Sequence, residues 1–131
     1  MIVLDASALI AFLDPADAWH GRAVGSLIDL GPSPLGLSPV THAEVLVGPT
    51  RAGTLRATQA ALATLGVAEI GLPGDAAPRL ARLRAEARLK LPDCCVILAA
   101  QQSTGLILTF DDRLAGVARE LAIAVEKPAS T

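Results

Sequence analysis

Residues 1–10 read MIVLDASALI, an apolar run that ends in an acidic residue and continues into a second apolar stretch. The run Ile2 to Leu4 does not alternate apolar and polar side chains, which is typical of a strand covered on both faces of a sheet. Asp5 lies between two apolar stretches, so we expect its carboxylate to be partly buried and to need a partner. This stretch predicts a buried parallel strand with a polar group at its end.

Similar short apolar runs recur along the chain, separated by longer segments with helical spacing. The expected strands are Ile2–Leu4, Val67–Ile70, Leu106–Leu108, Ile123–Val125 and a less apolar one at Leu35–Leu37. Alternation of strands with helices favours a parallel sheet between layers of helices. We therefore predict an α/β fold, a three-layer α/β/α arrangement around a central parallel sheet of four to five strands.

Four helices are indicated by apolar stripes and by residues that start or stop helices. The clearest is expected from Asp75 to Lys90, on the stripe Ala76, Leu80, Leu83, Ala87 and Leu91. The others are a helix opened by Ser38-Pro39 and ended by Gly48-Pro49, one opened by Pro92 and stopping near Gly105, and Arg113–Leu121 capped by Asp111.

Length and composition narrow the class of protein. At 131 residues and 52% hydrophobic content, the chain is expected to form one domain over residues 1–131. No apolar stretch is long enough to cross a bilayer and the N-terminus does not resemble a signal peptide, so we expect no membrane association and a cytoplasmic location. The adjacent Cys94 and Cys95 are expected to be reduced core residues, and His20 and His42 lack partners at metal-ligand spacing.

The totals do not suggest a nucleic-acid-binding protein. The net charge is −2, and the chain has one tryptophan, two phenylalanines and no tyrosine, which nearly excludes stacking platforms for bases. Basic residues do flank the apolar stripe of the predicted helix 75–90. Such residues usually form a solvated surface; the alternative is that they guide a phosphate backbone. They are Arg79, Arg82, Arg84, Arg88 and Lys90.

Four acidic residues are expected to converge at one edge of the sheet. Asp5 and Asp111 follow predicted strands, and the carboxyl ends of parallel strands form the ligand-binding edge of open α/β sheets. Glu44 and Asp93 lie early in their helices, so they will lie close to Asp5 and Asp111 if those helices also begin at this edge. Glu44 has apolar neighbours in sequence and should be partly buried. Asp93 and Asp111 could instead be ordinary helix-capping residues.

Clustered carboxylates repel one another unless protons or cations neutralise them. Oxygen ligands of this kind suit Mg²⁺ or Mn²⁺, which also bind substrate phosphate and can activate water. The acids Asp5, Glu44, Asp93 and Asp111 therefore predict a metal site for hydrolysis of a phosphodiester.

Four motifs in this order resemble the PIN-domain nucleases, and most closely the VapC toxins of toxin–antitoxin pairs. They lie at Val3–Leu9, Ser38–Val45, Leu91–Ala100 and Leu108–Leu114, and the agreement extends from about Val3 to Val125. The resemblance implies a metal-dependent endoribonuclease whose acidic quartet is Asp5, Glu44, Asp93 and Asp111. It also implies supporting roles for Ser7 and Thr109. Asp112 competes with Asp111 for the fourth position, but the spacing from Thr109 and to Leu114 favours Asp111 and makes Asp112 secondary.

The same resemblance implies partners. They are an RNA substrate, a small VapB-type antitoxin that places an arginine against the acids, and a second copy of the chain in a homodimer. The segment Arg51–Leu65 is a candidate antitoxin surface, although its apolar stripe is more commonly that of a helix packed on its own core.

Three other functions use related sequence features. A haloacid dehalogenase-type phosphatase requires a second Asp where Ser7 stands. A phosphoacceptor-like signalling domain would suit Thr109 and Lys127-Pro128, but it requires its Asp after a central strand, and Val67–Ile70 is followed by Gly71-Leu72-Pro73. A module that binds RNA or a partner without cutting would have no use for four converging acids.

Overall fold

The structure is a computed structural model that describes residues 1–128, and its centre is a parallel sheet of five strands. The order across the sheet is β3-β2-β1-β4-β5, so the N-terminal strand is central, with Val3 paired to Gly36 on one side and to Ile107 on the other. The strands are β1 (Ile2–Leu4), β2 (Leu35–Leu37), β3 (Ala68–Glu69), β4 (Leu106–Leu108) and β5 (Val125–Glu126). The predicted α/β fold is confirmed.

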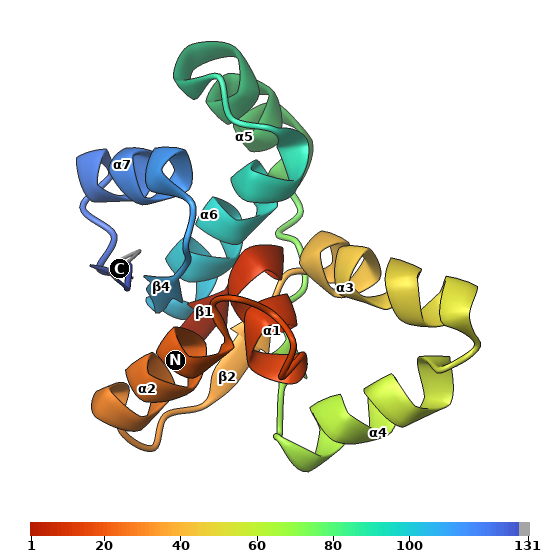
Figure 1. The fold of residues 1–131 in the computed structure, drawn as a ribbon. Helices are drawn as coiled ribbons and strands as arrows, with labels where there is room; N and C mark the ends of the chain where they lie inside the picture. The colour runs from red at the N-terminus through yellow and green to blue at the C-terminus, as the bar shows by residue number, and fades with distance from the viewer. Residues whose placement is uncertain (129–131) are drawn as a thin grey trace.

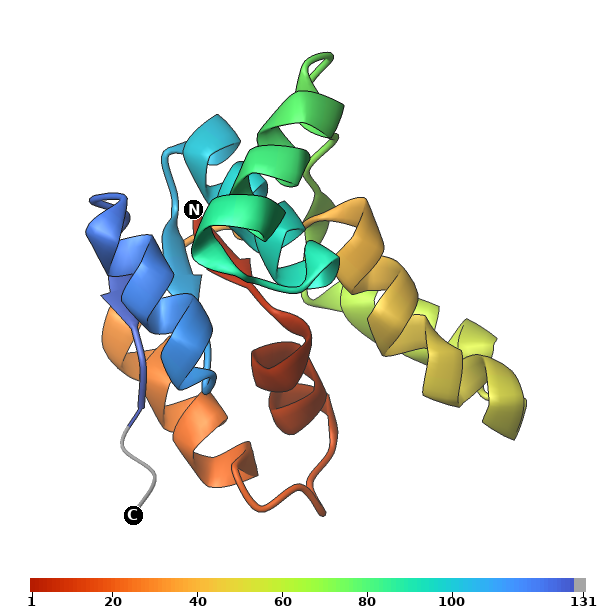
Figure 2. The ribbon, with the colours of Figure 1, turned by 90° about the horizontal axis from the view of Figure 1, so that it is seen from above.

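Helices cover both faces of this sheet, and α3 and α4 form a hairpin that projects to one side (Figures 1 and 2). A five-residue π-helical segment, η1, continues α5. The helices are α1 (Ala6–Leu13), α2 (His20–Leu30), α3 (Pro39–Ala52), α4 (Leu55–Thr64), α5 (Ala76–Arg82), η1 (Leu83–Ala87), α6 (Leu91–Ser103) and α7 (Asp112–Glu120).

Alternate residues of the central strands enter two separate cores, as the two-residue period of a strand requires. Val3 and Ile107 pack with α5, α6 and α7 on one face. Leu4 and Leu108 pack with α1, α3 and α4 on the other. Burial on both faces explains why β1 and β4 are continuously apolar in sequence.

The predicted edge strands differ in extent from those observed. Val67–Ile70 was expected to be a strand covered on both faces, but β3 contains only Ala68 and Glu69, and both are exposed. The strand expected at Ile123–Val125 begins two residues later, at Val125, after Ala122 adopts a left-handed conformation. Edge strands pair on one side only, so their apolar residues are a weaker guide to their limits.

The predicted end of α3 at Gly48-Pro49 is wrong, because the helix continues to Ala52 with Pro49 inside it. Proline removes one backbone donor, and the Thr50 hydroxyl donates to the Leu46 carbonyl at 2.7 Å in the same turn. The helix ends where Gly53 adopts φ 75°, the left-handed conformation of a common C-terminal cap.

The helix predicted over Asp75–Lys90 is also wrong at its end. It widens into η1 at Leu83 and stops at Arg88, which has φ 57°. The apolar stripe therefore does not continue to Leu91, which is 51% exposed, and Leu89 enters the core instead. The Arg84 side chain donates to the Leu89 carbonyl at 3.1 Å and holds this connection against α6.

The two cysteines are free and buried in α6, as expected of core residues. Within residues 1–128, no helix has the length and apolar content needed to cross a bilayer.

We predict that burial of β4 contributes strongly to stability. Ile107→Ala should lower the free energy of unfolding by about 2–5 kcal/mol, because Ile107 is fully buried and truncation leaves a cavity. Ile28→Ala makes the same chemical change at a side chain that is 72% exposed and should change it by less than about 0.5 kcal/mol. Urea unfolding of both variants measures this, and equal losses would contradict it.

Candidate active site

The four predicted acids all lie on elements that begin at the carboxyl edge of the sheet. Asp5 follows β1 and caps α1, and Asp111 follows β4 and caps α7. Glu44 is in the second turn of α3, which begins directly after β2, and Asp93 is in the first turn of α6. The chain thus brings together, at one edge, residues up to about a hundred positions apart.

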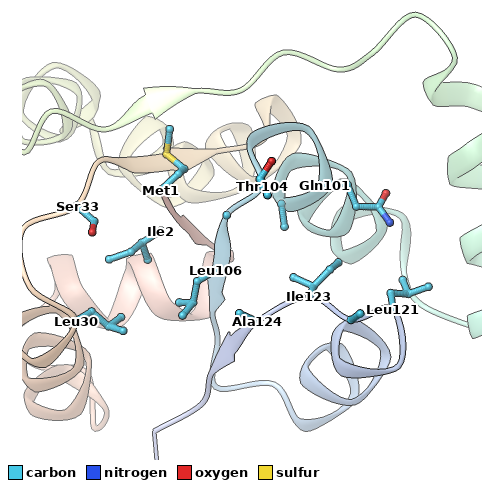
Figure 3. Close-up of a pocket in the computed structure, with 13 residues that line it drawn as sticks. Met1, Ile2, Leu30, Ser33, Gln101, Thr104, Leu106, Leu121, Ile123 and Ala124 are labelled. Carbon is cyan, nitrogen blue, oxygen red and sulfur yellow. The ribbon is translucent and has the colours of Figure 1, made fainter.

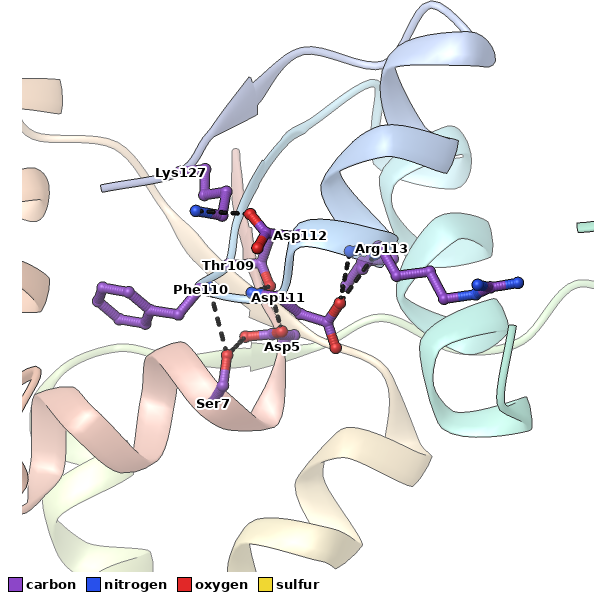
Figure 4. Close-up of polar contacts among 9 residues, drawn as sticks. Asp5, Ser7, Thr109, Phe110, Asp111, Asp112, Arg113 and Lys127 are labelled. Carbon is purple, nitrogen blue, oxygen red and sulfur yellow. Dashed lines mark hydrogen bonds and ion pairs between the residues drawn. The ribbon is translucent and has the colours of Figure 1, made fainter. Parts of the chain in front are cut away.

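Asp5 is the buried centre of this edge, with 4% of its surface exposed. Its Oδ1 accepts hydrogen bonds from the Ser7 hydroxyl at 2.7 Å and from the Ala8 backbone N–H at 2.9 Å. Its Oδ2 accepts from the Thr109 hydroxyl (Figure 4). A carboxylate has about four acceptor positions, so these three donors orient Asp5 and leave one position free.

Thr109 extends this network towards the second acid. Its hydroxyl donates to Asp5 and accepts from the Asp111 backbone N–H at 3.0 Å. The Asp111 carboxylate in turn accepts from the backbone N–H groups of Arg113 and Leu114 at 2.8 and 3.0 Å. Asp111 is therefore both a helix cap and a charge beside Asp5.

Asp112, the competitor for the fourth position, is directed elsewhere. Its Oδ1 lies 2.8 Å from Nζ of Lys127, and its side chain is 91% exposed (Figure 4). Lys127 was not anticipated as its partner, although it follows β5 and so also lies at the carboxyl edge. The geometry separates the two adjacent acids and leaves Asp111 beside Asp5.

The acids act on one another electrostatically. Burial raises the pKa of Asp5, and the charge of Asp111 raises it further against the lowering effect of its hydrogen bonds. Burial, followed by the charges of Asp111, Asp5 and Glu44, raises the pKa of Asp93 to about 6. Partial desolvation by its neighbours, followed by the charge of Asp5, raises the pKa of Glu44, although its side chain is exposed. Like charges that disfavour ionisation in this way create a demand for a cation.

Glu44 differs from the sequence-based expectation. It was predicted to be partly buried among apolar neighbours, yet it is exposed, because Val45 rather than Glu44 turns into the core. Asp93 is half-buried. Within residues 1–128, neither the Glu44 nor the Asp93 carboxylate accepts a hydrogen bond, so the oxygens of both are open to a ligand.

The donor set fits a hydrated divalent cation. Within the described part of the chain, no group of three or more His, Cys, Asp or Glu side chains is close enough to hold a metal ion directly. Charges interact over longer distances than ligand bonds, which is why the pKa values shift nonetheless. Mg²⁺ keeps several waters and commonly binds one or two carboxylates. Asp93 offers free oxygens for this, and Asp5 offers its one remaining acceptor position.

Among the predicted basic residues, Lys90 acts on the acids. Its charge lowers the pKa values of Glu44 and Asp93 against the effects of burial and of the neighbouring acids. Arg79 is engaged with Asp75 and Gln101, and Arg84 with a backbone carbonyl. Of the predicted basic flank, Lys90 is therefore the residue whose charge acts on Glu44 and Asp93.

A cavity of about 670 Å³ lies at the opposite edge of the sheet, where the amino ends of the strands lie (Figure 3). It is lined by residues such as Met1, Leu30, Gln101 and Ile123, and none of its lining side chains is ionisable. The histidines pair with groups outside the four acids: His20 contacts the Ala11 carbonyl at 2.8 Å, and His42 contacts Glu69 at 3.0 Å. Among the sites described within residues 1–128, the acid edge is the one that combines carboxylates, hydroxyls and a lysine.

Comparison with known proteins agrees with this geometry. The family model described as the PIN domain matches residues 2–120. The chain belongs to the PIN domain family. The sequence-based recognition is thereby confirmed, and no curated protein sequence matches the chain.

Solved structures extend the comparison. A toxin–antitoxin complex from Klebsiella pneumoniae contains a chain that is 26% identical, with all of both chains covered and a TM-score of 0.76. FitAcB from Neisseria gonorrhoeae is 21% identical over the whole of both chains, with a TM-score of 0.72. VapC20 of Mycobacterium tuberculosis, described as a sarcin-ricin loop cleaving toxin, is 19% identical over 89% of this chain and 95% of its own, also at 0.72.

The raised pKa of Asp93 predicts that its ionisation lowers the stability of the metal-free protein. The folded-state pKa of about 6 lies above the ordinary value of 3.8, so stability decreases as pH rises from about 4 to 6 and then stays low. Asp93→Asn should therefore stabilise the protein in EDTA at about pH 7.5, by on the order of 1 kcal/mol after solvent screening, and not at about pH 3.5.

Urea unfolding at both pH values measures this difference. Asp112→Asn is the control, because it removes an exposed acid outside the cluster and should have little effect at either pH. A loss of stability in Asp93→Asn at neutral pH would contradict the electrostatic interpretation.

Proposed function

We propose that this PIN-domain protein is a Mg²⁺- or Mn²⁺-dependent endoribonuclease that hydrolyses phosphodiester bonds in RNA. The observation that carries the proposal is the group of four carboxylates at the carboxyl edge of the sheet: Asp5, Glu44, Asp93 and Asp111. Desolvation and mutual repulsion raise the pKa values of three of them, Asp5, Glu44 and Asp93. An arrangement that is costly without a cation suits a site that works with one.

The residues would divide the work. Asp5, oriented by Ser7 and Thr109, would be the fixed ligand of the ion, and Asp93 would bind it from α6. Glu44 and Asp111 would bind and orient water molecules around it, since both are exposed at the same edge. A divalent ion bound here supplies an activated water and charge neutralisation for the phosphate. Lys90 would contact a neighbouring RNA phosphate.

The supporting residues act through Asp5. The Ser7 and Thr109 hydroxyls donate to its two different oxygens, so the carboxylate cannot rotate without losing a hydrogen bond. Partners of this kind fix the direction of a ligand's lone pairs, and their loss typically costs about 10–100-fold in metal affinity or activity. We assign Ser7 and Thr109 as positioning residues and Asp112 to the surface pair with Lys127.

We further propose that the protein is the toxin of a VapBC-type pair, cytoplasmic and homodimeric, with a VapB-type antitoxin as partner. Support comes from the similarity to a chain of a toxin–antitoxin complex at 26% identity over the whole length. An antitoxin arginine would suit the acid edge, because a guanidinium can bind two carboxylate oxygens and compete with the metal ion. The segment Arg51–Leu65 is not favoured as its surface, since Leu62 of α4 packs into the protein's own core.

We predict metal-dependent cleavage of RNA by the purified protein. A structured RNA should be cut with Mg²⁺ or Mn²⁺ and not in EDTA, whereas DNA of the same sequence should be cut poorly. Asp5→Asn and Asp93→Asn should each lose more than about 100-fold in rate while remaining folded, because each removes a proposed ligand. Gel analysis of end-labelled RNA measures the rate and circular dichroism the folding.

Asp112→Asn is the matched control for these variants. It removes an acid one position from Asp111 that pairs with Lys127 instead of facing Asp5, so it should keep near-normal activity. Cleavage that survives EDTA, or an Asp5→Asn variant that cuts normally, would refute the proposed metal site.

Expression in a bacterial host tests the toxin role. The wild-type protein should arrest growth, and coexpression of the gene immediately upstream should relieve the arrest. The Asp93→Asn variant should not arrest growth, which ties the effect to the acid site. Arrest by Asp93→Asn equal to that of the wild type would separate toxicity from the proposed nuclease.

A further inference from the structure

The chain has three aromatic residues, Phe12, Trp19 and Phe110, and two of them meet beside the acid site. The ring centroids of Trp19 and Phe110 are 4.7 Å apart, with an angle of 55° between the ring planes. Both side chains are half-buried. The composition had nearly excluded a stacking platform for bases, but it could not reveal that residues 91 positions apart share one site.

The two rings line a cavity of about 360 Å³ that also touches the acid network. Its other lining residues are Ser7, Ile10, Asp17 and Asp111. The volume falls within the roughly 300–1,000 Å³ range of small-molecule sites. We call it the Trp19–Phe110 cavity, and it is continuous with the acid edge through Ser7 and Asp111.

Backbone contacts hold Phe110 at a set position relative to the acids. Phe110 lies between Thr109 and Asp111 in sequence, and its N–H donates to the Ser7 hydroxyl at 3.4 Å. Ser7 in turn donates to Asp5. Figure 4 shows the Phe110 ring extending away from Asp111 on the side opposite Arg113. A group against this ring would lie directly beside the proposed reaction site.

Hydrogen bonds to nearby residues also hold the backbone of Trp19. Its N–H donates to Asp17 Oδ1 at 2.8 Å, and its carbonyl accepts from the Ala23 N–H at 2.9 Å at the start of α2. The Arg22 guanidinium carbon lies 5.6 Å from the ring centroid. The cavity therefore combines an aromatic wall, a cation at its side and the carboxylates of Asp17 and Asp111. This set suits the π-face and polar edge of a nucleobase better than an apolar peptide.

We propose that the Trp19–Phe110 cavity holds one nucleobase of single-stranded RNA, stacked on the aromatic wall, while the adjoining phosphate lies at the acid edge. This inference rests on the proposed nuclease function and specifies its substrate as an unpaired nucleotide. The Asp17 carboxylate supplies acceptors for the edge of the base, and the Ser7 hydroxyl, whose proton is donated to Asp5, supplies its remaining lone pair. A base uses such acceptors and an aliphatic side chain does not.

Trp19 is the only tryptophan, so intrinsic fluorescence reports on this cavity alone. The probe is a ten-nucleotide oligocytidylate, titrated with Mg²⁺ into the Asp93→Asn variant to prevent cleavage. The comparison probe is a ribose-phosphate chain of the same length that lacks bases. We expect the oligocytidylate to change the fluorescence and the abasic chain to bind without doing so. An equal fluorescence change with both probes would overturn the inference. So would an unchanged fluorescence under conditions in which the anisotropy of labelled RNA reports binding.

Variants in the active protein provide the second measurement. Trp19→Ala should raise KM for a single-stranded RNA by about 10-fold or more, since base stacking on an aromatic ring is worth that much or more in affinity. Trp19→Phe should largely restore it. Phe12→Leu removes the aromatic residue that does not line the cavity and should leave KM unchanged. If Trp19→Ala fails to fold, Phe110→Leu and the fluorescence titration decide the question.

The outcomes separate this inference from the proposed function. A wild-type protein that does not cut RNA refutes the nuclease, while the titration still tests the cavity. Cleavage with an unchanged KM in Trp19→Ala refutes the cavity inference alone. A fluorescence response to the purified antitoxin and not to oligocytidylate would assign the cavity to the protein partner and overturn the inference.

Discussion

The hydrogen-bonded Asp5 carboxylate ties together the elements on which the site depends. It receives donors from Ser7 and Ala8 at the start of α1 and from Thr109 after β4, so one buried side chain joins two neighbouring strands and the connections that leave them. Thr109 and Ser7 then hold the backbone of Asp111 and Phe110. A buried charge needs such partners, and here these partners position the neighbouring residues of the site.

The remaining acids are placed by the architecture of the sheet. Parallel strands send α1, α3 and α7 out from one edge, and α6 begins there because it must return to the start of β4. Asp5, Asp93 and Asp111 stand at helix N-termini, whose positive dipole ends offset part of the repulsion between carboxylates. The rest of the repulsion is expressed in the raised pKa values. The two-sided apolar core holds these charges together in spite of it.

Local rules failed where tertiary packing had a stronger preference. Pro49 was expected to end α3, because a proline inside a helix removes a hydrogen bond and crowds the preceding turn, yet the helix continues through it to the left-handed cap at Gly53. The stripe of α5 was extended to Leu91, whereas the π-helical segment η1 shifts the phase and buries Leu89. π-Helical segments often occur near functional sites, and this one directly precedes Lys90 and Asp93. Glu44 was judged by its apolar neighbours, although a helix turns consecutive residues to different faces.

The sequence by itself determined the parallel α/β class, the central strands β1 and β4, the free buried cysteines and the order of the motifs that carry the four acids. These features follow from local composition and from the order of motifs, because a strand buried on both faces must be apolar throughout. Only the tertiary structure decided that Asp112 pairs with Lys127, that Glu44 is exposed, and that Trp19 meets Phe110. Each of these depends on a side-chain direction or a long-range contact, which the spacing of residues along a chain does not specify.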